Sequence, residues 1–210
     1  MVRLYIDLET YRPSPEKAFI DERIVLVGLI IDETFYSEDS LTTDIEPILL
    51  REWNGLDEKK IVTELQRQVR KALQNHGFTV ICGYNILRFD IPLLICKSVH
   101  YSLGEHEAIC QMWNNCFTID YFQQLLAANN NRFKGLRLEN VVKIANKFNL
   151  KPPSYELSGG HMKDLYEQEK WKDIEKHNIQ DLKIIRWLDL YGAKQLFQIS
   201  MKERKALFHE

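Results

Sequence analysis

Apolar residues follow two regular patterns along this chain, and each pattern predicts one kind of element. Residues 23–31, with the sequence RIVLVGLII, form a run too apolar to be exposed, which is typical of a buried strand. In residues 56–75 the apolar positions instead recur every four residues, at Ile61, Leu65, Val69 and Leu73. That spacing places them on one face of a helix, and a glycine at position 77 then ends the helix.

The same patterns divide the rest of the chain into strands and helices. We expect strands at residues 2–7, 23–31, 34–36, 78–82 and 117–119. We expect helices at residues 56–75, 90–101, 121–128 and 138–148, and two or three more from residue 162 onward. Early strands followed by alternating helices and strands predict an α/β fold with a mixed sheet, in which early antiparallel strands join later parallel ones.

Composition narrows the class of protein without identifying a function. The 210 residues are 45% hydrophobic, enough for a large core, and we expect residues 1–210 to form one domain. The net charge is −2, so a nucleic-acid contact would have to be a local basic patch. No apolar run approaches the ~20 residues that span a bilayer, and the N-terminus lacks the form of a signal peptide. We therefore expect a cytoplasmic protein without membrane contact, in which the four cysteines are reduced thiols.

Two carboxylates interrupt the first expected strand, in the stretch YIDLET at residues 5–10. Acidic residues are poor strand formers, so their presence here requires an explanation. Asp7 and Glu9 are two residues apart, and a strand would therefore point both side chains to one face. The pair fits a solvated strand end as well as a site that attracts positive charge.

A third acid occurs in the stretch GYNILRFDIPLL, residues 83–94. Gly83 permits a tight turn after a strand, and Asp90 stands where a helix begins. The segment also has a purely structural interpretation, in which Asp90 is a helix N-cap and Asn85 is a turn residue.

A fourth acid lies in KHNIQDLKII, residues 176–185, where His177 and Asp181 are one turn apart on a helix. Asp181 stands between apolar residues, an awkward place to bury an acid without a partner. Four carboxylates that meet in one pocket cannot all ionise without a cation, and hard oxygen ligands in that number suit Mg²⁺ or Mn²⁺. Two such ions, about 3.5–4 Å apart, form a clamp used for in-line phosphoryl transfer.

These stretches, in this order, resemble the three Exo motifs of the DEDD, or DnaQ-like, 3′–5′ exonuclease superfamily. The motifs read D-x-E at Asp7 and Glu9, N-x-x-x-F-D from Asn85 to Asp90, and H-x-x-x-D from His177 to Asp181. The second is most similar to that of the exonuclease domains of family B DNA polymerases and their stand-alone relatives. The stretches CFTIDYFQQLL and GLRLENVVKIANKFNL resemble the segments that link the second and third motifs.

The resemblance implies a ribonuclease H-like fold, with a mixed five-stranded sheet flanked by helices. It also implies a free-standing nuclease, since no polymerase domain fits in 210 residues. The third motif departs from the family pattern. One branch of the superfamily has Tyr separated from the last Asp by three residues, and the other has His separated by four. His177 stands at the spacing of the tyrosine, which leaves its role open.

By this resemblance, the four acids would bind two divalent cations, Mg²⁺ or Mn²⁺. Asp7 would bridge both ions, Glu9 and Asp181 would complete the shell of the first, and Asp90 would hold the second, partly through water. One ion would activate the attacking water and the other would stabilise the leaving 3′ oxygen. His177 would orient or deprotonate that water, and the products would be 5′ mononucleotides.

Residues beside the acids are the expected substrate contacts. Leu8 and Thr10 adjoin the first two acids, and Thr10 would hydrogen-bond to the terminal nucleotide. Asn85, Arg88 and Phe89 precede the third acid, and Phe89 either faces the core or stacks on a base. A local basic cluster either contacts phosphates or is a solvated loop: Arg132, Lys134 and Arg137. Single-stranded DNA is preferred to RNA as the substrate because the second motif resembles that of polymerases.

Other interpretations stay open at this point. An exoribonuclease that trims RNA 3′ ends would use the same acids, since sugar discrimination lies in contacts to the 2′-OH. A non-catalytic nucleic-acid-binding protein can share the fold, although degenerate relatives usually lose acids. A zinc site without a C-x-x-C pair is the third alternative, from His100, His106, Cys110 and Cys116. Residues 159–161 form either a lid or a turn, and the oligomeric state, including a homo-oligomer, is open.

Overall fold

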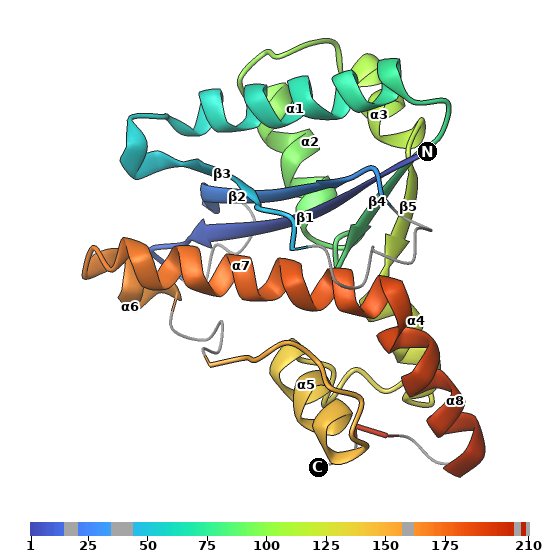
Figure 1. Ribbon diagram of the computed structural model, residues 1–210. Helices are drawn as coiled ribbons and strands as arrows, with labels where there is room; N and C mark the ends of the chain where they lie inside the picture. Colours follow the sequence, from blue (N-terminus) through green and yellow to red (C-terminus); the bar gives the residue numbers. More distant parts are fainter. Residues whose placement is uncertain (15–20, 35–43, 157–161, 204–206, 209–210) are drawn as a thin grey trace.

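A five-stranded mixed sheet forms the centre of the protein (Figure 1). The computed structural model describes residues 1–14, 21–34, 44–156, 162–203 and 207–208. The strands are β1 Val2–Tyr11, β2 Arg23–Asp32, β3 Ile48–Arg51, β4 Thr79–Gly83 and β5 Phe117–Asp120, in the spatial order β3-β2-β1-β4-β5. The pairs β1–β2 and β2–β3 are antiparallel, whereas β1–β4 and β4–β5 are parallel. The predicted α/β, ribonuclease H-like fold with a mixed sheet is confirmed.

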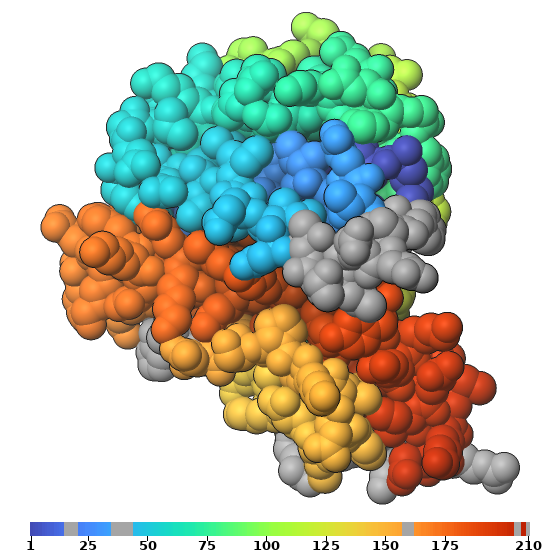
Figure 2. All heavy atoms as spheres, viewed as in Figure 1, coloured from blue at the N-terminus to red at the C-terminus, as the bar shows by residue number. Residues whose placement is uncertain are grey.

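Helices cover both faces of this sheet (Figure 1). One face carries α1 Glu58–Asn75, α2 Asp90–His100 and α3 His106–Asn114. The long α7 Trp171–Trp187 crosses the other face, preceded by α6 Met162–Glu167. Beyond α7, a lobe is built by α4 Tyr121–Ala128, α5 Leu138–Lys147 and α8 Ala193–Glu203 (Figure 2). Of the helices within the described residues, none is long and apolar enough to cross a lipid bilayer.

The central strand β1 divides its side chains between the two faces. Residues at even positions pack into the core on the α1 side: Val2, Leu4, Ile6 and Leu8. Tyr5 belongs to the core on the opposite side, with residues of α4, α5 and α7. Because successive strand residues point to opposite faces, Asp7 and Glu9 share the face of Tyr5. The alternation of β1 therefore directs both acids towards α7.

The structure differs from the sequence-based elements at the third strand and in one additional helix. The predicted strand at residues 34–36 lies, apart from Thr34, outside the described residues, and Thr34 itself is not in a strand. The observed β3 has four residues at the edge of the sheet, too few to show a period. The helix α3 was not predicted, although it buries Ile109, Met112 and Trp113. The strand β1 also runs past its acids to Tyr11, since Asp7 and Glu9 remain paired with β2.

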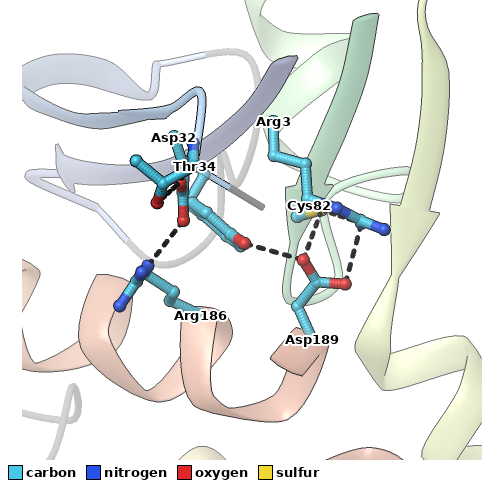
Figure 3. A network of polar contacts seen from close by, with 7 residues as sticks. Arg3, Asp32, Thr34, Cys82, Arg186 and Asp189 are labelled. Carbon is cyan, nitrogen blue, oxygen red and sulfur yellow. Dashed lines mark hydrogen bonds and ion pairs between the residues drawn. The ribbon is translucent and has the colours of Figure 1, made fainter. Parts of the chain in front are cut away.

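A buried polar network fastens the C-terminal end of α7 to the sheet (Figure 3). Asp189 lies in the π-helical stretch Leu188–Gly192 that joins α7 to α8. It accepts hydrogen bonds from Arg3 Nη1 at 2.8 Å and from Tyr5 Oη at 2.7 Å. Arg186 on α7 donates from Nε to Asp32, at the end of β2, at 2.9 Å. These bonds fix α7 along β1 and so determine which residues of the helix meet Asp7 and Glu9.

Candidate active site

Four acidic side chains come together where α7 crosses β1. Asp7 and Glu9 come from β1, Asp90 is the first residue of α2, and Asp181 lies on α7. Glu9, Asp90 and Asp181 are buried and Asp7 is half-buried. Asp7 interacts electrostatically with the other three carboxylates, which shows that all four share one site. The structure thus brings together the four acids that the sequence singled out.

The helix α7 contributes two side chains that hold the acids of β1. His177 Nδ1 lies 2.8 Å from Glu9 Oε1 and 3.8 Å from Asp181 Oδ2. Asn178 donates from Nδ2 to Asp7 Oδ2 at 2.8 Å and to the Asp7 carbonyl oxygen at 3.2 Å. Each acid of β1 is therefore oriented by its own partner on α7.

A glycine in β2 makes room for Asn178. Gly28 pairs with Asp7 across the sheet, and a Cβ atom at position 28 would lie 1.8 Å from Asn178 Oδ1. The close approach of α7 to the sheet therefore requires glycine at this position. Asn178 is not among the site residues predicted from the sequence, although the sequence contains a signal for it. An isolated glycine inside the branched run RIVLVGLII is typical of a strand that another group approaches closely.

The turn between β4 and α2 is fixed by Asp120 at the end of β5. The Asp120 carboxylate accepts a hydrogen bond from the backbone N–H of Asn85 at 2.9 Å. Asn85 has φ 61°, a left-handed conformation that asparagine tolerates, so it is a turn residue as its sequence position suggested. Phe89 occupies the N-cap position of α2, so Asp90 is not the cap. The Asp90 carboxylate instead accepts a hydrogen bond from the backbone of Leu8 in β1.

A tyrosine from the segment after α5 completes the group. Tyr155 Oη lies 3.4 Å from His177 Nε2, and the two rings meet edge-on. The hydroxyl is also close enough to Asp181 to lower the pKa of that carboxyl. Tyr155 is not among the site residues predicted from the sequence, because it follows the break at Pro152-Pro153 in a segment without a periodic pattern.

The carboxylates of the site repel one another in a poorly solvated place. Burial, then the charges of Asp181, Glu9 and Asp90, raise the pKa of Asp7 well above its usual range. Burial is also the main cause that raises the pKa of Asp90 to about 7 and that of Asp181 to about 7. Burial lowers the pKa of His177, but the hydrogen bond to Glu9 and the nearby negative charges outweigh it and raise that pKa to about 9.

The donor set of the site fits divalent cations. Asp181 Oδ1 is buried and has no hydrogen-bond partner within the described part of the chain. No Lys or Arg among the described residues forms an ion pair with the four acids, whose only such partner there is His177. Carboxylate oxygens that lack a cation are the ligands that Mg²⁺ and Mn²⁺ prefer. In residues 1–14, 21–34, 44–156, 162–203 and 207–208, no three His, Cys, Asp or Glu side chains already surround one metal position.

A pocket of 650 Å³ opens beside the acids. Its lining includes Asp7, Tyr155, His177 and Asp181 from the site. Three of the predicted substrate contacts also line it: Asn85, Arg88 and Phe89. From the basic cluster, Arg137 is part of the lining. The pocket therefore joins the acids to an arginine-bearing surface.

Two other predicted substrate contacts, Leu8 and Thr10, do not line this pocket. Leu8 packs into the apolar core on the α1 side, because alternate residues of β1 point away from the face of the acids. Thr10 Oγ1 donates to Glu22 Oε1 at 2.5 Å, beyond a shift in the β1–β2 register between Glu9 and Thr10. The predicted lid or turn at residues 159–161 lies outside the described residues.

The residues of the zinc alternative have local partners. His106 and Cys110 lie one turn apart on α3, with the Cys110 Sγ atom 3.5 Å from His106 Nε2. Cys116 is buried, and its Sγ atom lies 3.7 Å from the carbonyl oxygen of Met112. The ring of His100 packs edge-on against Tyr101.

Comparison with solved structures shows that the fold is shared with part of a larger DNA polymerase. The family B DNA polymerase from the hyperthermophilic archaeon Pyrobaculum calidifontis superposes with a TM-score of 0.58 at 13% sequence identity, over 98% of this chain and 26% of the polymerase. E. coli exonuclease I in complex with a 5cy-dT13 oligonucleotide gives a TM-score of 0.47 at 14% identity, over 97% of this chain and 43% of the exonuclease. Comparison of the sequence with protein-family models and with curated proteins gives no match. This chain thus spans less than half of either protein, and it has the fold of a segment of the polymerase.

Proposed function

We propose that this protein is a metal-dependent 3′–5′ exonuclease that hydrolyses single-stranded DNA to 5′ mononucleotides. The observation that carries the proposal is the cluster of Asp7, Glu9, Asp90 and Asp181, in which carboxylates from three elements meet without a lysine or arginine partner in the described residues. Such a cluster is destabilising unless a cation binds there, and a paired-cation site is suited to phosphodiester hydrolysis.

The four acids would hold two Mg²⁺ or Mn²⁺ ions, which would supply the positive charge that stabilises the pentavalent phosphate and the leaving 3′ oxygen. The protein itself positions the acids. Asn178 orients Asp7, and the backbone of Leu8 orients Asp90. These bonds fix the carboxylates before substrate arrives, which reduces the reorganisation that catalysis requires.

In this proposal His177 orients the attacking water. Glu9 binds its Nδ1 atom, so Nε2 is left on the side of Tyr155, and both rings line the pocket. From there the ring can hold a water beside the scissile phosphate. His177 thus occupies the tyrosine spacing of the third motif, while a tyrosine hydroxyl enters the site from another segment.

The proposed substrate is single-stranded because the pocket combines acids with exposed arginines and half-buried aromatic side chains, which suit unpaired nucleotides. The preference for DNA rests on the second motif, which resembles that of the exonuclease domains of family B DNA polymerases. The fold shared with a family B DNA polymerase agrees with this preference.

The test is a nuclease assay in which the lengths of the labelled products are resolved on a gel as a ladder. The protein is incubated with 5′-labelled single-stranded DNA or RNA of one sequence, with Mg²⁺, Mn²⁺ or EDTA. We expect metal-dependent shortening from the 3′ end, faster on DNA, with 5′ mononucleotides as products. Cleavage of RNA alone would instead support the exoribonuclease alternative.

A pair of variants on α7 excludes a contaminating nuclease. Asp181→Asn should abolish the ladder, whereas Asp173→Asn, an exposed acid in the first turn of the same helix, should retain it. Equal activity of the two variants would contradict the proposal. No cleavage by the folded wild-type protein with either metal would favour a non-catalytic nucleic-acid-binding protein.

A further inference from the structure

An exposed aromatic ring stands at the edge of the pocket that holds the acids. Phe133, in the loop between α4 and α5, is 55% exposed. Its ring lies 5.9 Å from that of Phe122, which itself lines the pocket and meets Tyr84 edge-on. The guanidinium of Arg88 lies 5.1 Å from the centre of the Phe133 ring. An arginine and a solvent-facing phenylalanine are therefore stacked beside the candidate active site.

Both walls of this part of the pocket are held by one carboxylate. Asp120 accepts hydrogen bonds from the backbone N–H of Asn85 at 2.9 Å and of Leu87 at 3.2 Å, which fixes the turn that carries Arg88. The same carboxylate caps α4 and accepts from the backbone N–H of Phe122 at 3.0 Å. Arg88 and Phe122 are thus presented from backbones that share a single anchor.

The loop that carries Phe133 is also fixed, although it is neither helix nor strand. The buried Asn129 donates from Nδ2 to the carbonyl oxygens of Arg132 at 2.5 Å and Lys134 at 3.1 Å, on either side of Phe133. Tyr84 Oη donates to the carbonyl oxygen of Leu136 at 2.5 Å and so ties this loop to the end of β4. An exposed ring on a loop held this firmly is preorganised for contact, which reduces the entropy lost on binding.

We propose that Phe133 and Arg88 form a binding station for single-stranded nucleic acid, at nucleotides on the 5′ side of the one being cleaved. The Phe133 ring stacks on a base, while Arg88 and the exposed Arg137 contact backbone phosphates. This inference rests on the proposed function, because the nuclease site at the other part of the pocket would hold the 3′ terminal nucleotide. Base stacking on Phe133 requires an unpaired base, so the station selects single strands over duplex.

The first test measures binding without metal, so that it is independent of catalysis. Fluorescence anisotropy of a labelled 12-nucleotide single strand in EDTA is compared for the wild type, Phe133→Ala and Phe117→Ala. Phe117 is the matched control, since it is 56% exposed and its ring lies 6.1 Å from that of Phe78, at a tilt, away from the pocket residues. We expect Phe133→Ala to weaken binding about tenfold, Phe133→Trp to restore it, and Phe117→Ala to have no such effect.

Salt dependence separates the two side chains. Arg88→Gln should lower the slope of log K against log salt by about 0.7, because one phosphate contact is lost. Phe133→Ala should leave that slope unchanged, since stacking releases no counterions. Equal weakening by Phe133→Ala and Phe117→Ala, or equal affinity of the wild type for duplex and single strand, would overturn the proposal.

A kinetic test distinguishes failure of this inference from failure of the proposed function. The p-nitrophenyl ester of thymidine 5′-monophosphate has no nucleotide to occupy the station, whereas a 12-nucleotide strand does. Phe133→Ala should lower kcat/KM for the strand at least fivefold more than for the ester, through KM. An equal change for both substrates would refute the station. A wild type that hydrolyses neither substrate, yet binds single strands through Phe133, would refute only the nuclease proposal.

Discussion

One face of β1 meets α7 and its continuation in two places, and the two places treat buried acids in opposite ways. Near the start of the strand, Arg3 and Tyr5 donate hydrogen bonds to Asp189, and Arg3 forms an ion pair with it at 2.8 Å. Further along the same face, Asp7 and Glu9 meet another part of the helix. There the strand supplies the acids and α7 supplies their partners.

The difference between these places is the supply of positive charge. Asp189 has an arginine and the hydroxyls of Tyr5 and Tyr121 as donors, so its charge is compensated within the fold. The acids of the candidate site have His177 as their only ion-pair partner in the described residues, and their other donors, Asn178, the Leu8 backbone and the Tyr155 hydroxyl, are neutral. The pKa of Asp7 is accordingly raised by burial and by its acidic neighbours. Burial of an acid therefore does not by itself mark a functional site. The proposed function rests instead on a group of buried acids that have too few donors within the described residues.

The largest expected effect is that of substituting Asp7, which tests the candidate site against the Asp189 network. Asp7→Asn would remove a proposed metal ligand while it keeps the shape of the side chain, so we expect the proposed nuclease activity to fall by roughly 10³-fold or more. The metal-free protein should not lose stability, because the substitution removes like-charge repulsion. Rates of mononucleotide release and thermal unfolding in EDTA check both parts. Activity close to that of the wild type would mean that Asp7 does not serve the reaction.

The opposite pattern is expected at Asp189. Asp189→Asn removes the carboxylate charge that pairs with the buried Arg3 at 2.8 Å, which should lower the free energy of unfolding by about 3–5 kcal/mol. Denaturant unfolding measures this loss. The control is Asp44→Asn, which removes an exposed ion pair with Lys183 and should change stability by less than about 1 kcal/mol. A similar small change at Asp189 would remove the distinction between the two places.

The pH dependence of stability tests whether the acids of the candidate site lack compensating charge, and it needs no mutation in the Asp189 network. The pKa of Asp90 is raised from 3.8 to about 7, so the folded state binds more protons than the unfolded state between these pH values. The contribution of Asp90 to the free energy of unfolding is present below pH 3.8 and is lost as the pH rises through about 7. The raised pKa of His177 acts in the same direction, with a contribution lost as the pH rises from 6.5 through about 9.

We therefore expect the metal-free protein to lose stability between pH 5 and pH 8, on the order of 3 kcal/mol from Asp90 alone. Asp90→Asn should flatten the profile over this range, and millimolar Mn²⁺ should restore stability to the wild type at pH 8. Denaturant unfolding in EDTA at a series of pH values provides the measurement. A profile that rises with pH would contradict the assignment of the raised pKa.

Local patterns predicted the parts of the molecule that depend on sequence neighbours. The helix at residues 121–128 was predicted to the residue, since its apolar period and capping Asp120 are local signals. The two-residue spacing of Asp7 and Glu9 likewise placed both on one face. The same alternation sends Leu8 to the opposite face, and the prediction of Leu8 as a substrate contact did not take this into account.

Other parts depend on contacts between distant segments, which no local pattern records. The edge strand β3 has four residues, and its position is set by pairing with β2. The only sequence signal for Asn178 is Gly28, which lies 150 residues earlier in the chain. Tyr155 belongs to an irregular segment, and packing against α7 alone brings its hydroxyl to His177.

The smallest expected effect is that of removing the Tyr155 hydroxyl, and it distinguishes a role in the candidate site from a role in stability. Tyr155→Phe keeps the ring against His177 but removes the hydroxyl that lies 3.4 Å from Nε2. We expect kcat to fall about tenfold, as for the loss of one hydrogen bond, with KM little changed. The control is Tyr101→Phe, whose hydroxyl donates to Glu58 at 2.6 Å on the opposite face of the sheet. That change should lower stability without lowering kcat. If Tyr155→Phe behaves as Tyr101→Phe does, Tyr155 belongs with Asp189 among the groups that hold the fold, and the site ends at His177.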